Sequence, residues 1–242
     1  MIGAILLAMS WLLLRWEGKS ISELGFNRPR RRLTEFAMGF SIAAVFCVAQ
    51  QVLIAGFSGF HWVVNQEMTL PVLLDSLRWN VNSVLFEELI FRGYLLYKAI
   101  QWLGPHRACL LSAASFGVYH WFSYGLLGNW IAMIYVFFLT GTFGLMLAIS
   151  FQRTQSVIAP IALHLGWNVV SIVVFSRGPI GPQLLIPSTT EPAMVSGVEQ
   201  IVINLLIPLS LPALVIWLMT RKPVNNPARK DQAAYPCEEV PK

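Results

Sequence analysis

The sequence predicts an all-α fold, a polytopic membrane bundle of about seven transmembrane helices. Of the 242 residues, 56% are hydrophobic and only 12% are charged, whereas soluble domains carry about 25% charged residues. The chain also contains several long apolar segments, and its basic residues collect between them. A water-soluble fold of this size could not bury so much apolar surface. Lipid is therefore the expected solvent.

Seven segments are apolar enough to form helices in a bilayer, where one span needs roughly 20 residues. In chain order they cover residues 1–14, 35–57, 71–100, 108–126, 129–150, 155–176 and 198–220. The first segment is short, and neither a preceding basic residue nor a following A-x-A site marks it as a signal peptide. We interpret it as a retained helix or a helix at the membrane edge.

The third segment is too long for a simple span. As one helix, residues 71–100 would measure about 45 Å. The segment must therefore tilt, kink or begin as an interfacial helix. The residues near its start that favour an interfacial opening are Pro71, Asp75, Arg78 and Asn80.

The basic residues predict the orientation, because cytoplasmic loops of membrane proteins are enriched in Lys and Arg. Segment 15–34, the connection near 98–107 and the tail after 220 hold most of them. This bias places the 15–34 loop and the C-terminus of an integral membrane protein in the cytoplasm. The net charge of +5 then indicates contact with anionic lipid headgroups, and no nucleic-acid partner is expected.

The domain organisation expected from these patterns is simple. Residues 1–220 form one membrane-embedded domain, and 221–242 form a disordered cytoplasmic tail because they are polar and contain proline. The loop 177–197 is rich in Pro, Gly, Ser and Thr. We expect it on the extracytoplasmic side, as a lid or as a plain connection.

Two adjacent glutamates stand inside an apolar stretch, Val84-Leu85-Phe86-Glu87-Glu88-Leu89-Ile90-Phe91. A charged group at membrane depth costs about 2.5–3.5 kcal/mol on insertion scales. Two like charges side by side raise this cost or force one of them to stay protonated. Such a pair is therefore a candidate functional site.

Arg92 follows Glu88 by four residues, so both lie on one helix face with the acid N-terminal, the better order for an ion pair. Glu87 points about 100° away on the helical wheel. We predict that Arg92 neutralises Glu88 and that Glu87 stays available as a general base.

Further polar residues occur in later apolar segments. His120 follows Phe116 by four residues, and His164 precedes Asn168 by four, so each pair shares a helix face. A carboxylate, imidazoles and an amide are the groups needed to activate water and stabilise an oxyanion. Two histidines and one glutamate also match a catalytic zinc site, for which the candidate ligands are Glu87, His120 and His164. The residues alone leave both the zinc site and a metal-free, glutamate-activated water open.

These motifs resemble the CPBP family, the CAAX-protease and bacteriocin-processing intramembrane endopeptidases also called the Abi family. The motifs are Glu87-Glu88-x-x-x-Arg92, Phe116-x-x-x-His120 and His164-x-x-x-Asn168. Each motif alone is weak, but the three occur in order within membrane segments. The resemblance covers residues 80–176, while the flanking helices agree in hydropathy only, with one clear N-terminal span fewer than the eight often found.

The resemblance implies a helical membrane bundle around a conical intramembrane catalytic cavity, and an enzyme that hydrolyses peptide bonds. Glu87 would activate the water and His120 would help to hold it. His164 and Asn168 would stabilise the oxyanion. The supporting residues would be Glu88 and Arg92. The implied substrate is a peptide or protein, lipidated or not: a prenylated protein, a bacteriocin leader or a regulatory peptide.

Three alternatives remain. Ser58, in Gly56-Phe57-Ser58-Gly59, could be a serine nucleophile paired with His164, but this leaves the glutamates without a role. Membrane carboxylates also build proton-coupled transporters, although no internal repeat is visible. Lastly, a non-catalytic immunity or regulatory protein could keep the same fold.

Overall fold

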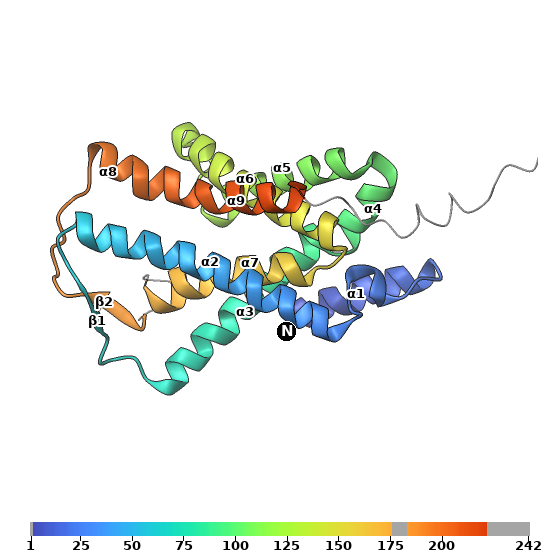
Figure 1. Ribbon diagram of the computed structural model, residues 1–242, viewed down its shortest axis with the longest axis horizontal. Coiled ribbons are helices and arrows are strands. Elements are labelled where there is room, and N and C mark those ends of the chain that lie inside the picture. Colours follow the sequence, from blue (N-terminus) through green and yellow to red (C-terminus); the bar gives the residue numbers. More distant parts are fainter. Residues whose placement is uncertain (1, 176–182, 222–242) are drawn as a thin grey trace, which may run out of the picture.

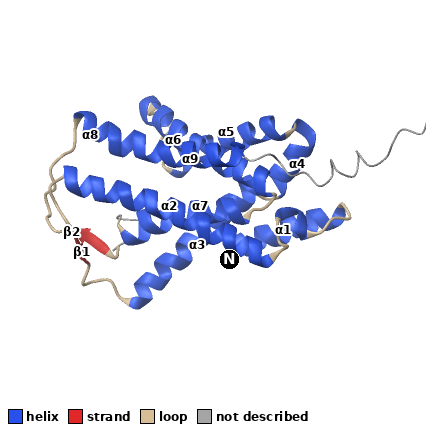
Figure 2. Ribbon diagram, viewed as in Figure 1, coloured by secondary structure: helices blue, strands red, loops and turns tan. Residues whose placement is uncertain are grey.

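The computed structural model describes residues 2–175 and 183–221, which form helices and one short two-stranded sheet (Figures 1 and 2). The α-helices in this part of the chain are α1 (Ile2–Trp16), α2 (Pro29–Phe57), α3 (Leu70–Arg92), α4 (Tyr94–Leu103), α5 (Pro105–Ser123), α6 (Trp130–Thr154), α7 (Ile158–Asn168), α8 (Gly197–Ile201) and α9 (Ile207–Arg221). The 3-10 helix η1 (Ile21–Leu24) precedes α2. The π-helices are η2 (Val169–Val174), which continues α7, and η3 (Val202–Leu206), which joins α8 to α9.

The helices confirm the predicted all-α membrane class. In the described part of the chain, three are long and apolar enough to cross a bilayer: Ile21–Phe57, Trp130–Thr154 and Gly197–Arg221. Two further apolar helices are shorter, Ile2–Trp16 and Ile158–Val174. Each of the seven predicted segments coincides with one helix or with a run of consecutive helices.

The third predicted segment is interrupted at Gly93, which separates α3 from α4. A Cβ atom on Gly93 would lie 2.2 Å from the carbonyl oxygen of Leu89, so only glycine fits this close turn. Of the predicted alternatives, a tilt, a kink or an interfacial opening, the structure thus shows a break of the helix at Gly93. Asp75 and Arg78 are exposed and paired at 3.1 Å, as expected at an interface. The prediction was wrong for Asn80, which is fully buried because it lies on the face of α3 that packs inside the bundle.

The short strands β1 (Trp62–Val64) and β2 (Leu185–Pro187) pair antiparallel, with Trp62 opposite Pro187. They lie at the end of the bundle opposite α1 and α4 (Figure 1). The second half of the predicted 177–197 loop is therefore tied to the segment after α2. Residues 176–182 lie outside the described residues, as does the predicted tail except for Arg221, which ends α9.

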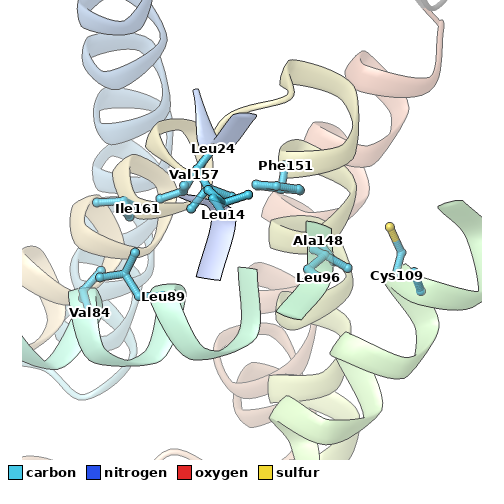
Figure 3. Close-up of a cluster of buried hydrophobic side chains, with 11 residues drawn as sticks. Leu14, Leu24, Val84, Leu89, Leu96, Cys109, Ala148, Phe151, Val157 and Ile161 are labelled. Atoms are coloured by element: carbon cyan, nitrogen blue, oxygen red, sulfur yellow. The ribbon is translucent and has the colours of Figure 1, made fainter. Parts of the chain in front are cut away.

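A cluster of buried apolar side chains joins α1, η1 and α3–α7 around the segment that carries the glutamates (Figure 3). Val84 and Leu89 of α3 face Ile161 of α7 within it. Because lipid tails are as apolar as these side chains, van der Waals packing stabilises such contacts in a bilayer. The cluster fixes α3 beside α7.

Outside the apolar cluster, a buried arginine ties the start of α2 to the end of α6. Arg32 donates from Nε to the Gly25 carbonyl at 2.9 Å and from Nη1 to the Thr154 carbonyl at 3.2 Å. Its Nη1 also donates to Glu35 at 2.7 Å, and its Nη2 to Asn27 at 3.1 Å. One side chain thus satisfies two backbone carbonyls from separate segments.

We expect Arg32→Ala to destabilise the protein by about 3 kcal/mol, because it removes charge-assisted hydrogen bonds to buried carbonyls. The measurement is the midpoint of thermal unfolding in detergent. Arg30→Ala is the matched control, since Arg30 is an exposed arginine on the same helix turn. Equal midpoints for the two variants would contradict this role of Arg32.

Glu17, just after α1, joins α1 to α4. It accepts a hydrogen bond from the Tyr94 hydroxyl and one from Lys98 Nζ at 3.0 Å. These two donors, the tyrosine foremost, lower the pKa of Glu17 from 4.5 to about 2. Because the folded-state pKa lies below the unfolded one, the stabilisation is complete above pH 4.5 and is lost only as pH falls towards 2.

Candidate active site

The structure gathers most of the predicted polar residues in the interior of the bundle. Helix α3 carries Glu87, Glu88 and Arg92, α5 carries His120, and α7 carries His164 and Asn168. All are buried except Asn168, which is half-buried. Titratable groups at such depth must be paired or act in chemistry, because their burial is costly.

The predicted ion pair between Glu88 and Arg92 is confirmed. Arg92 Nη1 lies 3.2 Å from Glu88 Oε1, and both side chains are completely inaccessible to solvent. Arg92 Nη2 also donates to the carbonyl of Gly144 on α6 at 2.9 Å. The guanidinium lies over the ring of Phe116, 4.2 Å from the ring centroid, in a cation–π contact. Arg92 is therefore held from three helices.

Glu88 has a second partner that the sequence did not reveal. His164 Nδ1 lies 2.7 Å from Glu88 Oε1, the same oxygen that faces Arg92. Because an ionised carboxylate only accepts hydrogen bonds, Nδ1 carries the proton in this contact. The carboxylate thus fixes the ring orientation of His164 and directs its other nitrogen, Nε2, elsewhere.

That nitrogen faces Glu87. His164 Nε2 and Glu87 Oε2 are 3.9 Å apart, too far for a direct hydrogen bond. Glu87 Oε2 is buried and has no hydrogen-bond donor among the described residues. The two glutamates therefore face the two nitrogens of one imidazole, one in direct contact and one across a short gap.

The ring of Phe116 contacts three of the site residues. Besides Arg92, it packs edge-on against His120, with 4.5 Å between ring centroids, and against His164 at 6.0 Å. The carbonyl of Phe116 accepts a hydrogen bond from His120 Nδ1 at 2.8 Å. The phenylalanine of F-x-x-x-H thus connects the arginine to both histidines, a role that spacing alone does not reveal.

Gly144 is a second residue that the sequence analysis missed. A Cβ atom there would lie 2.9 Å from Arg92 Nη2 and 3.0 Å from Phe116 Cδ1. Glycine at this position lets α6 approach the guanidinium closely enough for its carbonyl to accept the hydrogen bond. No pattern in the sequence marks Gly144 among 17 glycines.

We expect Gly144→Ala to lower the unfolding midpoint and reduce activity, because the added methyl displaces Arg92 or Phe116 and overpacking costs about 1–3 kcal/mol. Gly141→Ala is the matched control one turn earlier on α6, where a Cβ would meet only ordinary contact at 3.7 Å. If the two variants had equal unfolding midpoints and equal activities, the added methyl group at position 144 would not disturb Arg92 or Phe116.

Other predicted site features are not brought together. The side chain of Asn168 makes no hydrogen bond with the other five predicted site residues. Ser58 ends α2, where its carbonyl accepts a hydrogen bond from Ala193, and no contact links it to His164.

A cavity of about 470 Å³ lies beside α3, lined by Ile2, Arg78, Trp79, Asn82, Ser83 and Phe86. The six predicted site residues do not line it.

The possible metal ligands are only partly grouped. Over residues 2–175 and 183–221, no three His, Cys, Asp or Glu side chains are placed to hold a metal ion. Glu87 and His164 face one another, but His164 Nδ1 is already bonded to Glu88. Of the three candidate zinc ligands, two therefore lie together, while His120 is not grouped with them.

Similarity to known proteins supports the interpretation of the motifs. Residues 69–170 match the family model described as type II CAAX prenyl endopeptidase Rce1-like. This range contains all six predicted site residues and every hydrogen bond and ion pair between them. No curated protein and no solved structure matches the chain significantly. The match supports the resemblance of residues 69–170, and with them the buried site, to the CAAX-protease (CPBP) family.

Proposed function

We propose that the protein is an intramembrane endopeptidase in which Glu87 activates the water that hydrolyses a peptide bond. The observation that carries this proposal is the 3.9 Å gap between Glu87 Oε2 and His164 Nε2, inside a buried site. One water molecule can bond to both atoms across such a gap. The carboxylate of Glu87 is also not engaged by Arg92, which faces Glu88.

The proposed role of His164 requires a hydrogen on each ring nitrogen, and the carboxylates of Glu87 and Glu88 face these two nitrogens. In this form His164 donates from Nδ1 to Glu88 and presents an Nε2–H towards Glu87. An N–H at this position can stabilise an oxyanion.

The proposed reaction follows from these groups. Glu87 takes a proton from the water, and the hydroxide attacks the carbonyl carbon of the scissile bond. The oxyanion is stabilised by His164 Nε2–H, with the Asn168 amide on the next turn as second donor. Glu87 then passes its proton to the leaving amine as the C–N bond breaks. Because His120 Nδ1 donates to the Phe116 carbonyl, its Nε2 is free to accept a hydrogen bond from the water.

The proposed substrate is a prenylated protein, a bacteriocin leader or a regulatory peptide, which reaches the site from the membrane of a bacterial cell. The proposed orientation keeps the C-terminus in the cytoplasm, as the basic residues predict. Because the described residues do not group Glu87, His120 and His164 around one position for a metal ion, the reaction that we propose is the metal-free one.

The test is proteolysis by purified protein in liposomes, with a fluorogenic prenylated peptide and a panel of leader peptides. The reaction is run with and without a chelator. We expect cleavage of at least one peptide. Chelator-resistant cleavage supports the metal-free reaction, and chelator-sensitive cleavage that zinc restores would contradict it. A folded protein that cleaves nothing across the panel would contradict the proposed activity.

A further inference from the structure

A third polar residue of α3 lies buried beside the candidate site. Asn80 has no exposed surface and precedes Glu87 by seven residues, which places both on one face of the helix, about 10 Å apart along its axis. The proposed reaction gives it no role. A fully buried amide needs a hydrogen-bond partner.

That partner is the backbone of α7. Asn80 Nδ2 donates to the carbonyl oxygen of Asn168 at 3.2 Å. Asn168 is the last residue of α7, and the π-helix η2 follows directly. At this junction the backbone changes from i+4 to i+5 pairing. The Asn168 carbonyl also accepts a longer hydrogen bond, 3.5 Å, from the Ser171 hydroxyl of η2, so Asn80 is the donor that ties this carbonyl to α3.

The bond is a direct hydrogen bond between α3 and α7. Glu88 and His164 make another such bond at 2.7 Å. On α3, Glu87 lies between Asn80 and Glu88, while His164 and Asn168 stand one turn apart on α7. Two hydrogen bonds between α3 and α7 therefore lie near the gap between Glu87 and His164: that of Asn80 with Asn168 and that of Glu88 with His164.

The second polar atom of Asn80 argues against a purely structural role. Its Oδ1 is buried and has no hydrogen-bond partner among the described residues. A buried, unpaired acceptor lowers stability. Leucine has nearly the same size and carries no such atom, so packing alone would favour leucine at this position. The amide donor is what asparagine adds.

From these contacts we infer that Asn80 is a positioning residue for peptide cleavage, an inference that rests on the proposed endopeptidase function. Its amide holds the Asn168 carbonyl and keeps the turn from His164 to Asn168 in register with Glu87. Asn80 touches neither water nor substrate. Without this hydrogen bond, the distance between Glu87 Oε2 and His164 Nε2 becomes longer or more variable. The surface that binds the substrate stays intact.

The decisive variant is Asn80→Leu, which removes the donor and the unpaired oxygen together. Because a displacement of about 1 Å at a reacting centre can cost 100-fold, we expect kcat to fall about 10- to 100-fold. KM should stay within about twofold, because the substrate-binding surface is unchanged. The unfolding midpoint should stay near that of wild type, because the loss of the hydrogen bond to the Asn168 carbonyl is offset by the removal of the unpaired Oδ1. Hydrogen exchange over residues 164–174 should become faster.

Asn65→Leu is the matched control. Asn65 is also buried, and its Nδ2 donates to the carbonyl of Gln183 at 3.0 Å, beside the β1–β2 pair. We expect this variant to lose stability and to keep the wild-type kcat. A loss of kcat in Asn80→Leu but not in Asn65→Leu would separate positioning from general loosening of the fold.

Two results are distinguishable. If wild type cleaves, Glu87→Gln does not, and Asn80→Leu has the wild-type kcat, the positioning role is overturned and the proposed function stands. If Glu87→Gln cleaves as fast as wild type, the proposed function fails, and the role of Asn80 in it fails too. Unchanged hydrogen exchange over 164–174 in Asn80→Leu would independently overturn the link between Asn80 and α7.

Discussion

Replacing Glu87 with glutamine is expected to lower kcat by about 10⁴-fold, near the upper end of what a lost general base costs. Glutamine keeps the size of the side chain, so the packing of α3 against α7 should not change. An amide, however, cannot take a proton from water at neutral pH. The measurement is kcat in liposomes together with the unfolding midpoint, and the midpoint should equal or exceed that of wild type, since a buried carboxylate is removed.

Two further variants sharpen this prediction. Glu87→Asp keeps the carboxylate and withdraws it by one methylene, so we expect partial activity between wild type and Glu87→Gln. Glu67→Gln is the matched control, because Glu67 is exposed and lies before α3, and it should behave as wild type. If Glu87→Gln and Glu67→Gln were equally active, Glu87 would not be the base.

Replacing Arg92 with leucine is expected to destabilise the protein by about 3–5 kcal/mol, because a buried carboxylate loses its cation. The carboxylate left without a partner, Glu88, has no exposed surface. Water therefore cannot solvate its charge in place of the guanidinium. Activity should fall with stability, since an unpaired Glu88 no longer holds His164. The measurement is the unfolding midpoint in detergent, with cleavage measured below that temperature.

A double variant separates the two consequences. Glu88→Leu combined with Arg92→Leu removes both charges, and replacing a buried pair by apolar residues is often neutral for stability. We expect the unfolding midpoint to recover and the activity to stay low, because His164 has lost its carboxylate. Arg78→Leu is the control, since its ion pair with Asp75 is 73% and 65% exposed and should be worth less than about 1 kcal/mol. A single Arg92→Leu variant as stable as Arg78→Leu would show that Glu88 is not charged.

The sequence predicts the helical segments and the Glu88–Arg92 pair because both follow from local rules. Apolar length defines a span, and residues four apart on a helix meet. The contact of Glu88 with His164 joins residues 76 positions apart, so it depends on how α7 packs against α3. The hydrogen bond from Arg92 to the carbonyl of Gly144 could not be predicted either. Every residue has a backbone carbonyl, so the sequence does not show which one accepts the bond.

Asn80 shows how a local rule can mislead. A polar residue near the start of a long apolar segment resembles an interfacial position, as Asp75 and Arg78 are. The helical period contains the correct signal, since Asn80 precedes Val84 by four residues and Glu88 by eight, and both are buried. Only the packed helices show that the buried face of α3 extends this far.

The most direct test of the central claim is a single turnover in ¹⁸O-labelled water, with wild type and Glu87→Gln compared in liposomes on one cleavable peptide. Mass spectrometry of the product reports whether its new carboxylate carries the label. We predict one ¹⁸O atom per product molecule from wild type and no product from Glu87→Gln on the same timescale. Unlabelled product from wild type, or labelled product at the wild-type rate from Glu87→Gln, would contradict a water activated by Glu87.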